Sequence, residues 1–242
     1  TGVFGVQTYA ISRGEGVETV DTKFAPMERW IGGLGMPGLT AYFGLYEVGQ
    51  VKPSDTVVVS GAAGAVGSIA GQLARNMGCR VVGIAGGSEK CRHVNDKLGF
   101  DACLDHRLEL KPQLKAACPH GIDLYFDNVG GPIQELMLSR MNTFGRISVC
   151  GLISQYNAKT LPPGPRTFSA ILTKRLTVRG FIVFDFRERY GEALRILSAQ
   201  YEAGSLTMVE DVREKPIDDF PGLLAHLFTG AKLGKLALRI VH

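Results

Sequence analysis

The residues of this 242-residue chain that most clearly indicate chemistry form a run of small side chains directly after an apolar segment. The spacing Ala62-x-Gly64-x-x-Gly67 follows the valine-rich Thr56–Ser60. It is the dinucleotide fingerprint with alanine in first position, and its glycines allow a pyrophosphate and a packed helix to approach the backbone. The start of the next helix would offer unpaired N–H groups and a positive dipole end to phosphates. A tight strand-to-helix turn without a ligand would give the same pattern.

The residues about twenty positions further on bear on which dinucleotide would bind, because a site for NAD places an acidic residue there to hold the ribose 2′-hydroxyl. This sequence instead has Gly86-Gly87-Ser88-Glu89-Lys90, which offers open space, a hydroxyl and an ammonium group. The pattern favours NADP(H), whose 2′-phosphate would occupy such a pocket. Glu89 and Lys90 also suit the polar first turn of an ordinary helix.

The elements that must position these residues alternate along the chain. Short apolar runs predict buried strands at Thr56–Ser60, Arg80–Ile84, Asp123–Phe126 and Arg146–Val149. Helical patterns lie between or beside them, at Val66–Met77, Glu89–Leu98, Leu108–Ala117 and Ile133–Arg140. This alternation predicts an α/β fold with a doubly wound parallel sheet of the Rossmann type.

The two ends of the chain differ from this middle part. Residues 1–55 show little periodicity, whereas beyond residue 204 the pattern predicts a strand at Leu206–Val209, a helix at Phe220–Phe228 and a strand at Lys235–Val241. We therefore expect the ends to belong together in a second domain. The expected division is 1–35, 36–204 and 205–242, with the cofactor-binding domain in the middle.

Composition and charge narrow the function classes. With 45% hydrophobic and 21% charged residues, the chain is expected to be globular rather than disordered. A net charge of +4 gives no support to a nucleic-acid-binding surface. Five cysteines without a CxxC spacing fit reduced thiols in the cytoplasm better than disulfides or a zinc cage. The uncharged stretch Thr56–Ala74 is interrupted by glycines, so it predicts strand, turn and helix rather than a membrane span.

Several motifs, in order along practically the whole chain, resemble the medium-chain dehydrogenase/reductases, and among them the zinc-independent double-bond reductases. That branch includes prostaglandin, plant alkenal and curcumin-reductase-like enzymes. The matching segments are Met36–Tyr42, Ser60–Gly67, Gly83–Lys90, Phe126–Gly131, Cys150–Asn157 and Leu161–Pro165. The resemblance implies a Rossmann domain plus a GroES-like β-barrel catalytic domain, incomplete in this chain and formed by both termini. It also implies a homodimer, for which Leu176–Val183 is a plausible pairing edge.

The resemblance also assigns site residues. Cofactor contacts are implied for the pyrophosphate turn (Ala62, Gly64, Ala65, Val66 and Gly67), the 2′-phosphate pocket (Gly86, Ser88 and Lys90), the nicotinamide side (Asn128 and Cys150) and the interdomain cleft (Met36 and Thr40). The family often has a tyrosine near His106, and Asp105-His106-Arg107 could do similar work. Tyr156 would orient the cofactor and the substrate oxygen.

A purely structural role remains an alternative for two of these residues. Tyr156 also fits a loop residue at a domain edge, and Cys150 a small buried residue at a strand end. Two positions depart from the family pattern. Lys232 stands where an asparagine usually precedes Leu/Phe-Gly-Lys, a departure that affects one nicotinamide-side contact implied by the family. Met36 stands about where zinc-dependent relatives carry a cysteine ligand.

The activity implied by the resemblance is reduction of the carbon–carbon double bond of an α,β-unsaturated ketone or aldehyde by NADPH, with hydride transfer to the β-carbon. Tyr156 would donate a hydrogen bond to the developing enolate oxygen. We expect no metal, because a thioether is a poor zinc ligand and the sequence has no Cys/His cluster. Two alternatives remain: an NADPH quinone reductase, and a cofactor-binding protein without turnover. The expected partner is a small enone or enal, with neither nucleic acid nor membrane.

Overall fold

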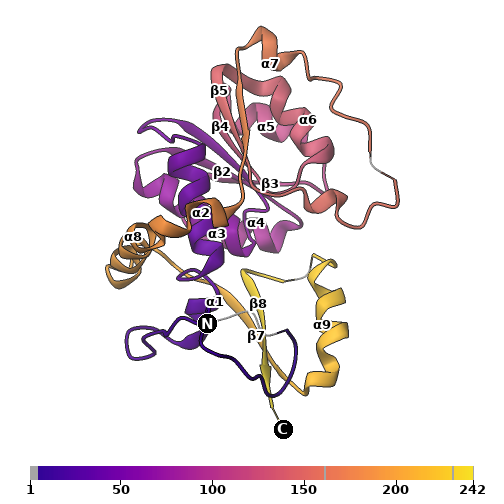
Figure 1. The fold of residues 1–242 in the computed structure, drawn as a ribbon. Helices are drawn as coiled ribbons and strands as arrows, with labels where there is room; N and C mark the ends of the chain where they lie inside the picture. Colours follow the sequence, from indigo (N-terminus) through magenta and orange to yellow (C-terminus); the bar gives the residue numbers. More distant parts are fainter. Residues whose placement is uncertain (1–4, 161, 231, 242) are drawn as a thin grey trace.

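A computed structural model describes residues 5–160, 162–230 and 232–241. Leu161, the first residue of one segment that carries the family resemblance, lies outside the described residues. Six parallel strands form the central sheet, in the order β3-β2-β1-β4-β5-β6 (Figure 1). Their bounds are β1 Thr56–Ser60, β2 Arg80–Ala85, β3 Ala102–Asp105, β4 Ile122–Asp127, β5 Met141–Val149 and β6 Thr177–Gly180. This is the strand order of the dinucleotide-binding fold, so the Rossmann prediction is confirmed.

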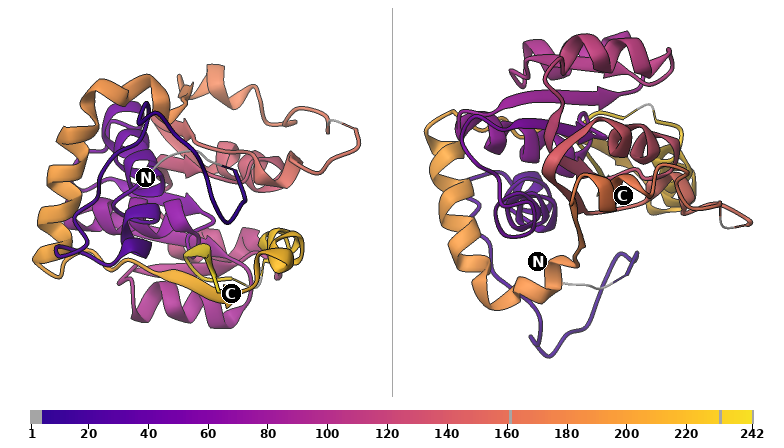
Figure 2. Two further views of the ribbon diagram at one scale, coloured as in Figure 1. Left: turned by 60° about the horizontal axis from the view of Figure 1, so that its bottom comes forward. Right: turned by 90° about the horizontal axis from the view of Figure 1, so that it is seen from above.

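Helices cover both faces of this sheet (Figure 2). They are α2 Met36–Phe43, α3 Ala65–Asn76, α4 Ser88–Asp96, α5 Leu110–Ala117, α6 Gly131–Arg140, α7 Ala170–Thr173 and α8 Tyr190–Glu202. Shorter turns are the π-helix η1 Gly44–Val48 and the 3-10 segments η2 Ile153–Gln155 and η3 Val183–Arg189. Each face of the sheet therefore has its own helical layer.

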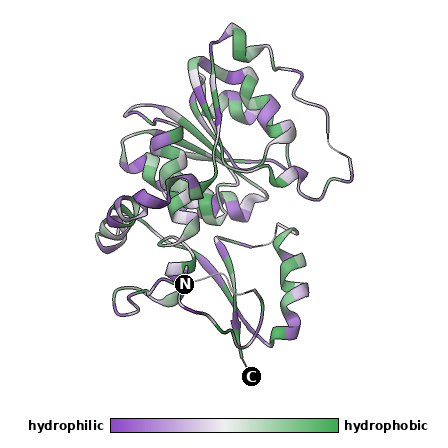
Figure 3. Ribbon diagram, in the orientation of Figure 1, coloured by the Kyte–Doolittle hydropathy of each residue, from purple (hydrophilic) through white to green (hydrophobic). Residues whose placement is uncertain are grey.

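Strand β1 shows how the valine-rich sequence builds two hydrophobic cores. Val57 and Val59 pack with residues of α2 and α3, whereas Val58 packs with residues of α5 and α6. Successive side chains of a strand point to opposite faces, so a run of three buried valines serves both layers. Figure 3 shows the hydrophobic residues gathered on the central strands.

A second, two-stranded parallel sheet consists of β7 Glu210–Lys215 and β8 Lys235–Ile240. The 3-10 turn η4 Ile217–Asp219 and helix α9 Phe220–Leu227 connect the two strands. Helix α1 Met27–Ile31 lies beside β7, where Arg29 forms an ion pair with Glu210. Helix α9 is mostly hydrophobic in sequence, yet none of its residues is buried (Figure 3). This sheet therefore has much less covering than the first.

The predicted strand at Leu206–Val209 is wrong, because these residues precede β7 in an irregular segment. Leu206 and Met208 are buried there against the core that includes α3. The Gln72 side chain accepts a hydrogen bond from the Thr207 N–H at 2.8 Å and donates one to the Thr207 carbonyl at 2.9 Å. The apolar residues thus reflect packing of a loop whose backbone is satisfied by a side chain rather than by a neighbouring strand.

The elements that the sequence patterns missed include β3 and the helices α2 and α8. Helix α2 starts at Met36 in a glycine-rich stretch, with Pro37 in its first turn, and six of its eight residues are buried. A side chain at Gly38 would overlap the Gly33 carbonyl, so the local glycines permit close packing of backbone on backbone. A helix buried on nearly all sides has no amphipathic period to detect. Among the helices in the described ranges, none combines the length and apolar character needed to cross a bilayer.

Candidate functional site

The turn between β1 and α3 is shaped by close backbone contacts. The N–H of Ala62 donates to the carbonyl of Ile84 on β2 at 3.0 Å, and the N–H of Gly64 donates to that of Gly61 at 2.9 Å. Gly61 has φ of +62°, a conformation that favours glycine. A side chain at Gly67 would overlap the Gly61 carbonyl. Glycine at position 67 is therefore required for α3 to begin this close to the strand.

The start of α3 presents backbone donors to the carboxyl edge of the sheet. Gly64 is the N-cap, and the N–H of Ser68 donates the first helical hydrogen bond, to the Gly64 carbonyl at 3.0 Å. The N–H groups of the three residues between them, Ala65, Val66 and Gly67, precede that bond and have no partner within the helix. Together with the helix dipole they form a site suited to a phosphate.

A cavity of about 360 Å³ lies beside this turn. Its walls come from the β2–α4 junction, from the residues after β3 and from the segment before β8: Gly86, Gly87, Ser88, Glu89, Lys90, Arg107, Gly230 and Leu233. Burial, and then repulsion from the Arg107 charge, lower the pKa of the Lys90 ammonium. Two cations and a hydroxyl, against the single carboxylate of Glu89, give this cavity a positive excess that fits a bound anion.

Arg107 is brought to this cavity by the parallel register of β2 and β3, which pairs Ala85 with Asp105. The Asp105 carboxylate accepts hydrogen bonds from the N–H groups of Gly87 at 2.8 Å and of Arg107 at 2.9 Å. These two bonds, that of Gly87 first, lower the pKa of Asp105. The ionised carboxylate thus ties the two loop ends together.

His106 and Arg107 occupy different places. A methyl group added to Gly86 would lie 2.7 Å from Nε2 of His106, so the imidazole packs against that glycine. Arg107, by contrast, lines the cavity itself. The sequence analysis singled out His106 from the Asp105-His106-Arg107 segment, whereas the geometry favours Arg107 as the cation for the phosphate. No local pattern distinguishes the two exposed neighbours.

At the ends of β4 and β5 a buried carboxylate organises the backbone. Oδ1 of Asp127, which is fully buried, accepts hydrogen bonds from the Tyr125 hydroxyl at 2.8 Å and the Ser60 hydroxyl at 3.2 Å. It also accepts from the N–H groups of Val129 and Gly130, both at 2.9 Å. The loop after β4 is therefore folded around one side chain. The motif containing Asp127 was noted in the sequence, but its role was not.

Asn128 and Cys150, which the resemblance assigns to the nicotinamide side, directly follow the paired strands β4 and β5. The Asn128 amide donates to the Ser60 carbonyl at 2.7 Å, and the Cys150 N–H donates to the Asp127 carbonyl at 2.8 Å. Burial first, and then the Asp127 charge, raise the pKa of the Cys150 thiol to about 12. The thiol is thus neutral at ordinary pH and is neither a nucleophile nor a ready acid.

Tyr156 lies over the loop that these residues form. Its hydroxyl oxygen is the acceptor for the Leu152 N–H at 3.4 Å and would lie 3.1 Å from a methyl group added to Gly151. The ring is 63% exposed. Because the oxygen accepts this bond, the phenolic proton remains available for another acceptor. The structure therefore brings Tyr156 to the carboxyl ends of β4 and β5, beside Asn128 and Cys150.

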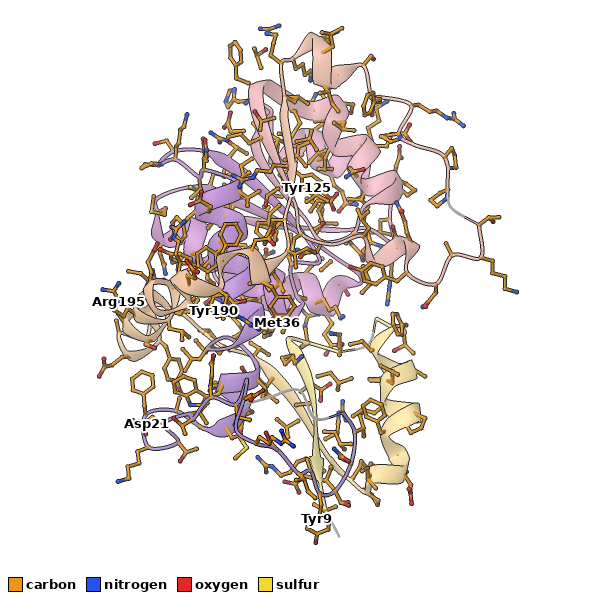
Figure 4. All side chains as sticks on the ribbon, in the orientation of Figure 1. Tyr9, Asp21, Met36, Tyr125, Tyr190 and Arg195 are labelled. Carbon is orange, nitrogen blue, oxygen red and sulfur yellow. The ribbon has the colours of Figure 1, made fainter. Side chains whose placement is uncertain are left out.

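Met36 and Thr40 lie on the first turns of α2. The Thr40 hydroxyl donates to the Met36 carbonyl at 2.7 Å, and Met36 is 50% exposed. Met36 lies where the central sheet and its helices meet the two-stranded sheet of β7 and β8, called the lower sheet from here on (Figure 4). Within the described ranges, no group of three or more His, Cys, Asp or Glu side chains is arranged to hold a metal ion.

Comparison with known proteins identifies the family to which this chain is related. Residues 65–199, more than half of the chain, match the family described as zinc-binding dehydrogenase. The NADPH-dependent curcumin reductase of Escherichia coli (strain K12) is 41% identical over 245 residues, which cover 99% of this chain and 71% of that enzyme. The chain belongs to the medium-chain dehydrogenase/reductase family. It falls within the double-bond reductase branch, as the resemblance implied.

Two further relatives support this placement. The NADP(+)-dependent 2-alkenal reductase of Nicotiana tabacum is 41% identical to this medium-chain reductase over 223 residues. The aligned region covers 91% of this chain and 64% of the tobacco enzyme. The crystal structure of CurA from Vibrio vulnificus in complex with NADPH superposes with a TM-score of 0.91 at 42% identity, over 98% of this chain and 72% of CurA. The chain spans about two thirds of the length of the curated relatives that it matches, from 64% to 71% for four of them.

Proposed function

We propose that this medium-chain dehydrogenase/reductase catalyses the NADPH-dependent reduction of the carbon–carbon double bond of α,β-unsaturated ketones and aldehydes. The observation that carries the proposal is the position of the Tyr156 hydroxyl over Gly151, at the same edge of the sheet as the phosphate turn. Relatives named as curcumin, 2-alkenal and prostaglandin reductases support the substrate class.

The residues of the phosphate turn and the adjoining cavity fit the adenine half of NADPH. Backbone donors at the start of α3 would hold the pyrophosphate, with Gly67 needed for the close approach. Ser88, Lys90 and Arg107 would hold the 2′-phosphate in the cavity that they line. NADPH, once bound, supplies a hydride to the β-carbon of the substrate and leaves as NADP⁺.

Tyr156 would act on the substrate oxygen. As the hydride reaches the β-carbon, the electron pair of the double bond shifts toward the carbonyl oxygen and forms an enolate. A hydrogen bond from the phenolic proton stabilises that charge, because the donor is already held in place by the Leu152 N–H. A proton from water then adds to the α-carbon. Cys150 is neutral because its pKa is about 12, and it would transfer no proton.

The test is to follow NADPH oxidation with a panel of enones, enals and quinones, with NADH as a control. Tyr156→Phe is expected to lower kcat by about a hundredfold, the usual size of one lost oxyanion donor, with little change in the dissociation constant of NADPH. Tyr9→Phe is the matched control, because Tyr9 is also exposed, at 82%, and lies at the far end of the molecule (Figure 4).

The alternatives give different results in the same assay. Activity confined to quinones indicates a quinone reductase. NADPH binding without oxidation by any acceptor indicates a cofactor-binding protein without turnover. Unchanged turnover of Tyr156→Phe removes this residue from the mechanism, and tighter binding of NADH than of NADPH contradicts the role of the cation-lined cavity.

We also propose the division into residues 1–35, 36–204 and 205–242, with the first and last parts forming the GroES-like catalytic domain of the family. The separate sheet of β7 and β8 and its ion pair with α1 support the grouping of the two ends. Catalysis is proposed to be zinc-independent, because Met36 stands where zinc-dependent relatives have a cysteine. Five free cysteines fit a reducing compartment such as the cytoplasm.

A homodimer through strand β6 is proposed as well. β6 pairs with β5 only and ends the sheet, and all four of its residues are exposed. Val178, Ile182 and Phe184 add exposed apolar surface at 43%, 61% and 52%. Such an unprotected edge favours pairing with a second copy. Sedimentation of wild type and Val178→Lys tests the proposal, since the charged variant should sediment as a monomer.

A further inference from the structure

The cavity beside the phosphate turn is built from both sheets. Ser88, Lys90 and Arg107 belong to the central sheet layer, whereas Gly230 and Leu233 belong to the segment that precedes β8. This segment extends toward the central layer from the lower sheet (Figure 1). Lys232 lies between these two wall residues along the chain, and its charge acts on that of Lys90, a residue of the opposite wall.

The backbone next to Lys232 is fixed on the phosphate turn. The Gly234 N–H donates to the Ala63 carbonyl at 2.8 Å, and Gly234 forms a parallel bridge with Gly64. Gly234 has φ of +63°, and a side chain there would overlap the Val209 carbonyl. The segment carrying Lys232 is therefore docked on the turn by main-chain contacts that only glycine permits at this position.

The charges around this segment are unbalanced. Burial first, then repulsion from Lys235 and from Lys90, lower the pKa of Lys232, and Asp211 opposes this. Asp211 itself forms an ion pair with Arg213 at 2.6 Å. Within the described ranges, no ion pair joins Lys90, Arg107, Lys232 or Lys235 to a carboxylate. The cavity wall carries two cations, Lys90 and Arg107, and one carboxylate, Glu89. The nearby charge of Lys232 adds a positive excess that a bound anion would balance.

We propose that Lys232 is a cofactor-specificity residue, which contacts from the lower sheet the same phosphate that Ser88, Lys90 and Arg107 face. The proposal rests on the proposed use of NADPH and extends it. A ribose 2′-phosphate in this cavity would have partners on both sheets, so its binding would hold the segment before β8 against the phosphate turn. NADH lacks this group and would leave Lys232 without a partner anion.

The test measures binding of adenosine nucleotides to the intact chain by calorimetry at low salt, without any turnover. The probes are 2′,5′-ADP, which carries a 2′-phosphate and a 5′-phosphate, and 5′-AMP, which carries the 5′-phosphate alone. Lys232→Met should weaken binding of 2′,5′-ADP about tenfold or more, the size of one charge-assisted contact, and leave the affinity for 5′-AMP within about twofold. Lys232→Arg should retain most of the wild-type affinity for 2′,5′-ADP.

Lys215→Met is the matched control. Lys215 lies on β7, in the same two-stranded sheet, and is paired in register with Ile240 at the opposite end from Lys235. Lys215→Met removes one positive charge from the lower sheet, as Lys232→Met does from the segment before it, but should leave the affinity for both probes unchanged.

The outcomes separate the two proposals. If wild type does not prefer 2′,5′-ADP over 5′-AMP, the proposed cofactor is wrong. If wild type prefers 2′,5′-ADP but Lys232→Met binds it equally well, the role of Lys232 is wrong. Equal weakening of both probes also overturns the inference, since Lys232 would then act on the 5′-phosphate or on the fold.

A second measurement reports on the joining of the sheets. Hydrogen exchange of the backbone amides in Lys235–Ile240 should slow when 2′,5′-ADP saturates the wild type, because a ligand that bridges two units stabilises their contact. The slowing should be lost in Lys232→Met and kept in Lys215→Met. Equal protection in Lys232→Met would contradict the proposal even if its affinity were reduced.

Discussion

The central sheet and the lower sheet position their residues by different means. All of β1 except Thr56 is buried, and hydrophobic clusters lie on both faces of the central sheet. In the lower sheet, Ala237 is the one buried residue among those of β7 and β8, and α9 has none. The lower sheet is instead tied to its neighbours by the Arg29–Glu210 ion pair and the Gly234–Ala63 hydrogen bond.

This difference bears on function. Loops at the carboxyl edge of the central sheet start from strands that packing holds rigid, so the phosphate turn and the loop around Asp127 are formed before any ligand binds. The lower sheet depends on a few polar contacts, and such regions open at lower free energy than a packed core. A ligand that contacts both sheets would therefore change the lower one more.

The largest expected effect comes from closing the phosphate turn. Gly67→Val places a side chain against the Gly61 carbonyl and displaces the start of α3 from the turn. NADPH affinity should fall by about a hundredfold or more, because the helix-start donors move together. Nicotinamide fluorescence titration measures this. Gly191→Ala, in a helix with no heavy atom within 4 Å of the added methyl, is the control and should bind as wild type does.

Next in size is the loss of the buried carboxylate in the central layer. Asp127→Ala leaves the Tyr125 hydroxyl and the N–H groups of Val129 and Gly130 without their acceptor. The free energy of unfolding should fall by about 3 kcal/mol, measured by urea denaturation. Tyr125→Phe removes a single donor and should cost only about 1 kcal/mol. Equal losses for the two variants would show that the carboxylate does not organise the loop.

A smaller, local effect is expected in the lower sheet. Arg29→Met leaves the Glu210 carboxylate, whose side chain is 2% exposed, without its partner cation. The free energy of opening of β7 should fall by about 2 kcal/mol, less than for a fully buried pair because Arg29 is partly exposed. Amide exchange in β7 measures it. Lys215→Met, which removes an exposed ion pair between β7 and Asp219, is the control and should change exchange little.

The last expected effect distinguishes the two sheets by the pH dependence of stability. Burial raises the pKa of Cys79 and Cys118 to about 11, and that of Cys150 to about 12. These thiols ionise first in the unfolded chain, so their contribution to stability is constant below about pH 8.5 and falls as the pH rises toward 11 to 12. The sequence from residue 205 onward has no cysteine, so this loss belongs to the central layer.

Two lysines in and next to the lower sheet change the stability with pH in the opposite direction. The pKa of Lys232 and of Lys235 is lowered, chiefly by burial, so these groups lose protons first in the folded chain and stabilise it as the pH rises through that window. Urea denaturation between pH 8 and 11 should therefore show a steeper alkaline loss in Lys232→Met than in wild type. A shallower loss would reverse the assigned sign.

Much of the central layer could be predicted from sequence because its signals are local. A strand that is buried on both faces must be apolar throughout, and Thr56–Ser60 shows this directly. The fingerprint glycines act within one turn, and the alternation of strands and helices requires a parallel sheet. Local signals failed where burial came from elsewhere: α2 is apolar all round, and Leu206–Val209 is apolar because it packs on α3.

The candidate site divides in the same way. Ser88 and Lys90 could be assigned to a phosphate from their distance along the chain after the fingerprint, since one βαβ unit fixes that distance. Arg107 reaches the same cavity only through the register of β2 with β3, and Tyr156 reaches Gly151 only through the fold of its own loop.

The sequence by itself determined the fold class, the phosphate turn and the preference for a phosphorylated ribose, because each depends on residues close together in the chain. Only the tertiary structure decided that Arg107 rather than His106 lines the cavity, that Asp127 organises the loop after β4, and that Gly234 docks on the phosphate turn. These are meetings of segments far apart in the chain. They depend on strand register and on backbone contacts at glycines, which leave no periodic pattern in the sequence.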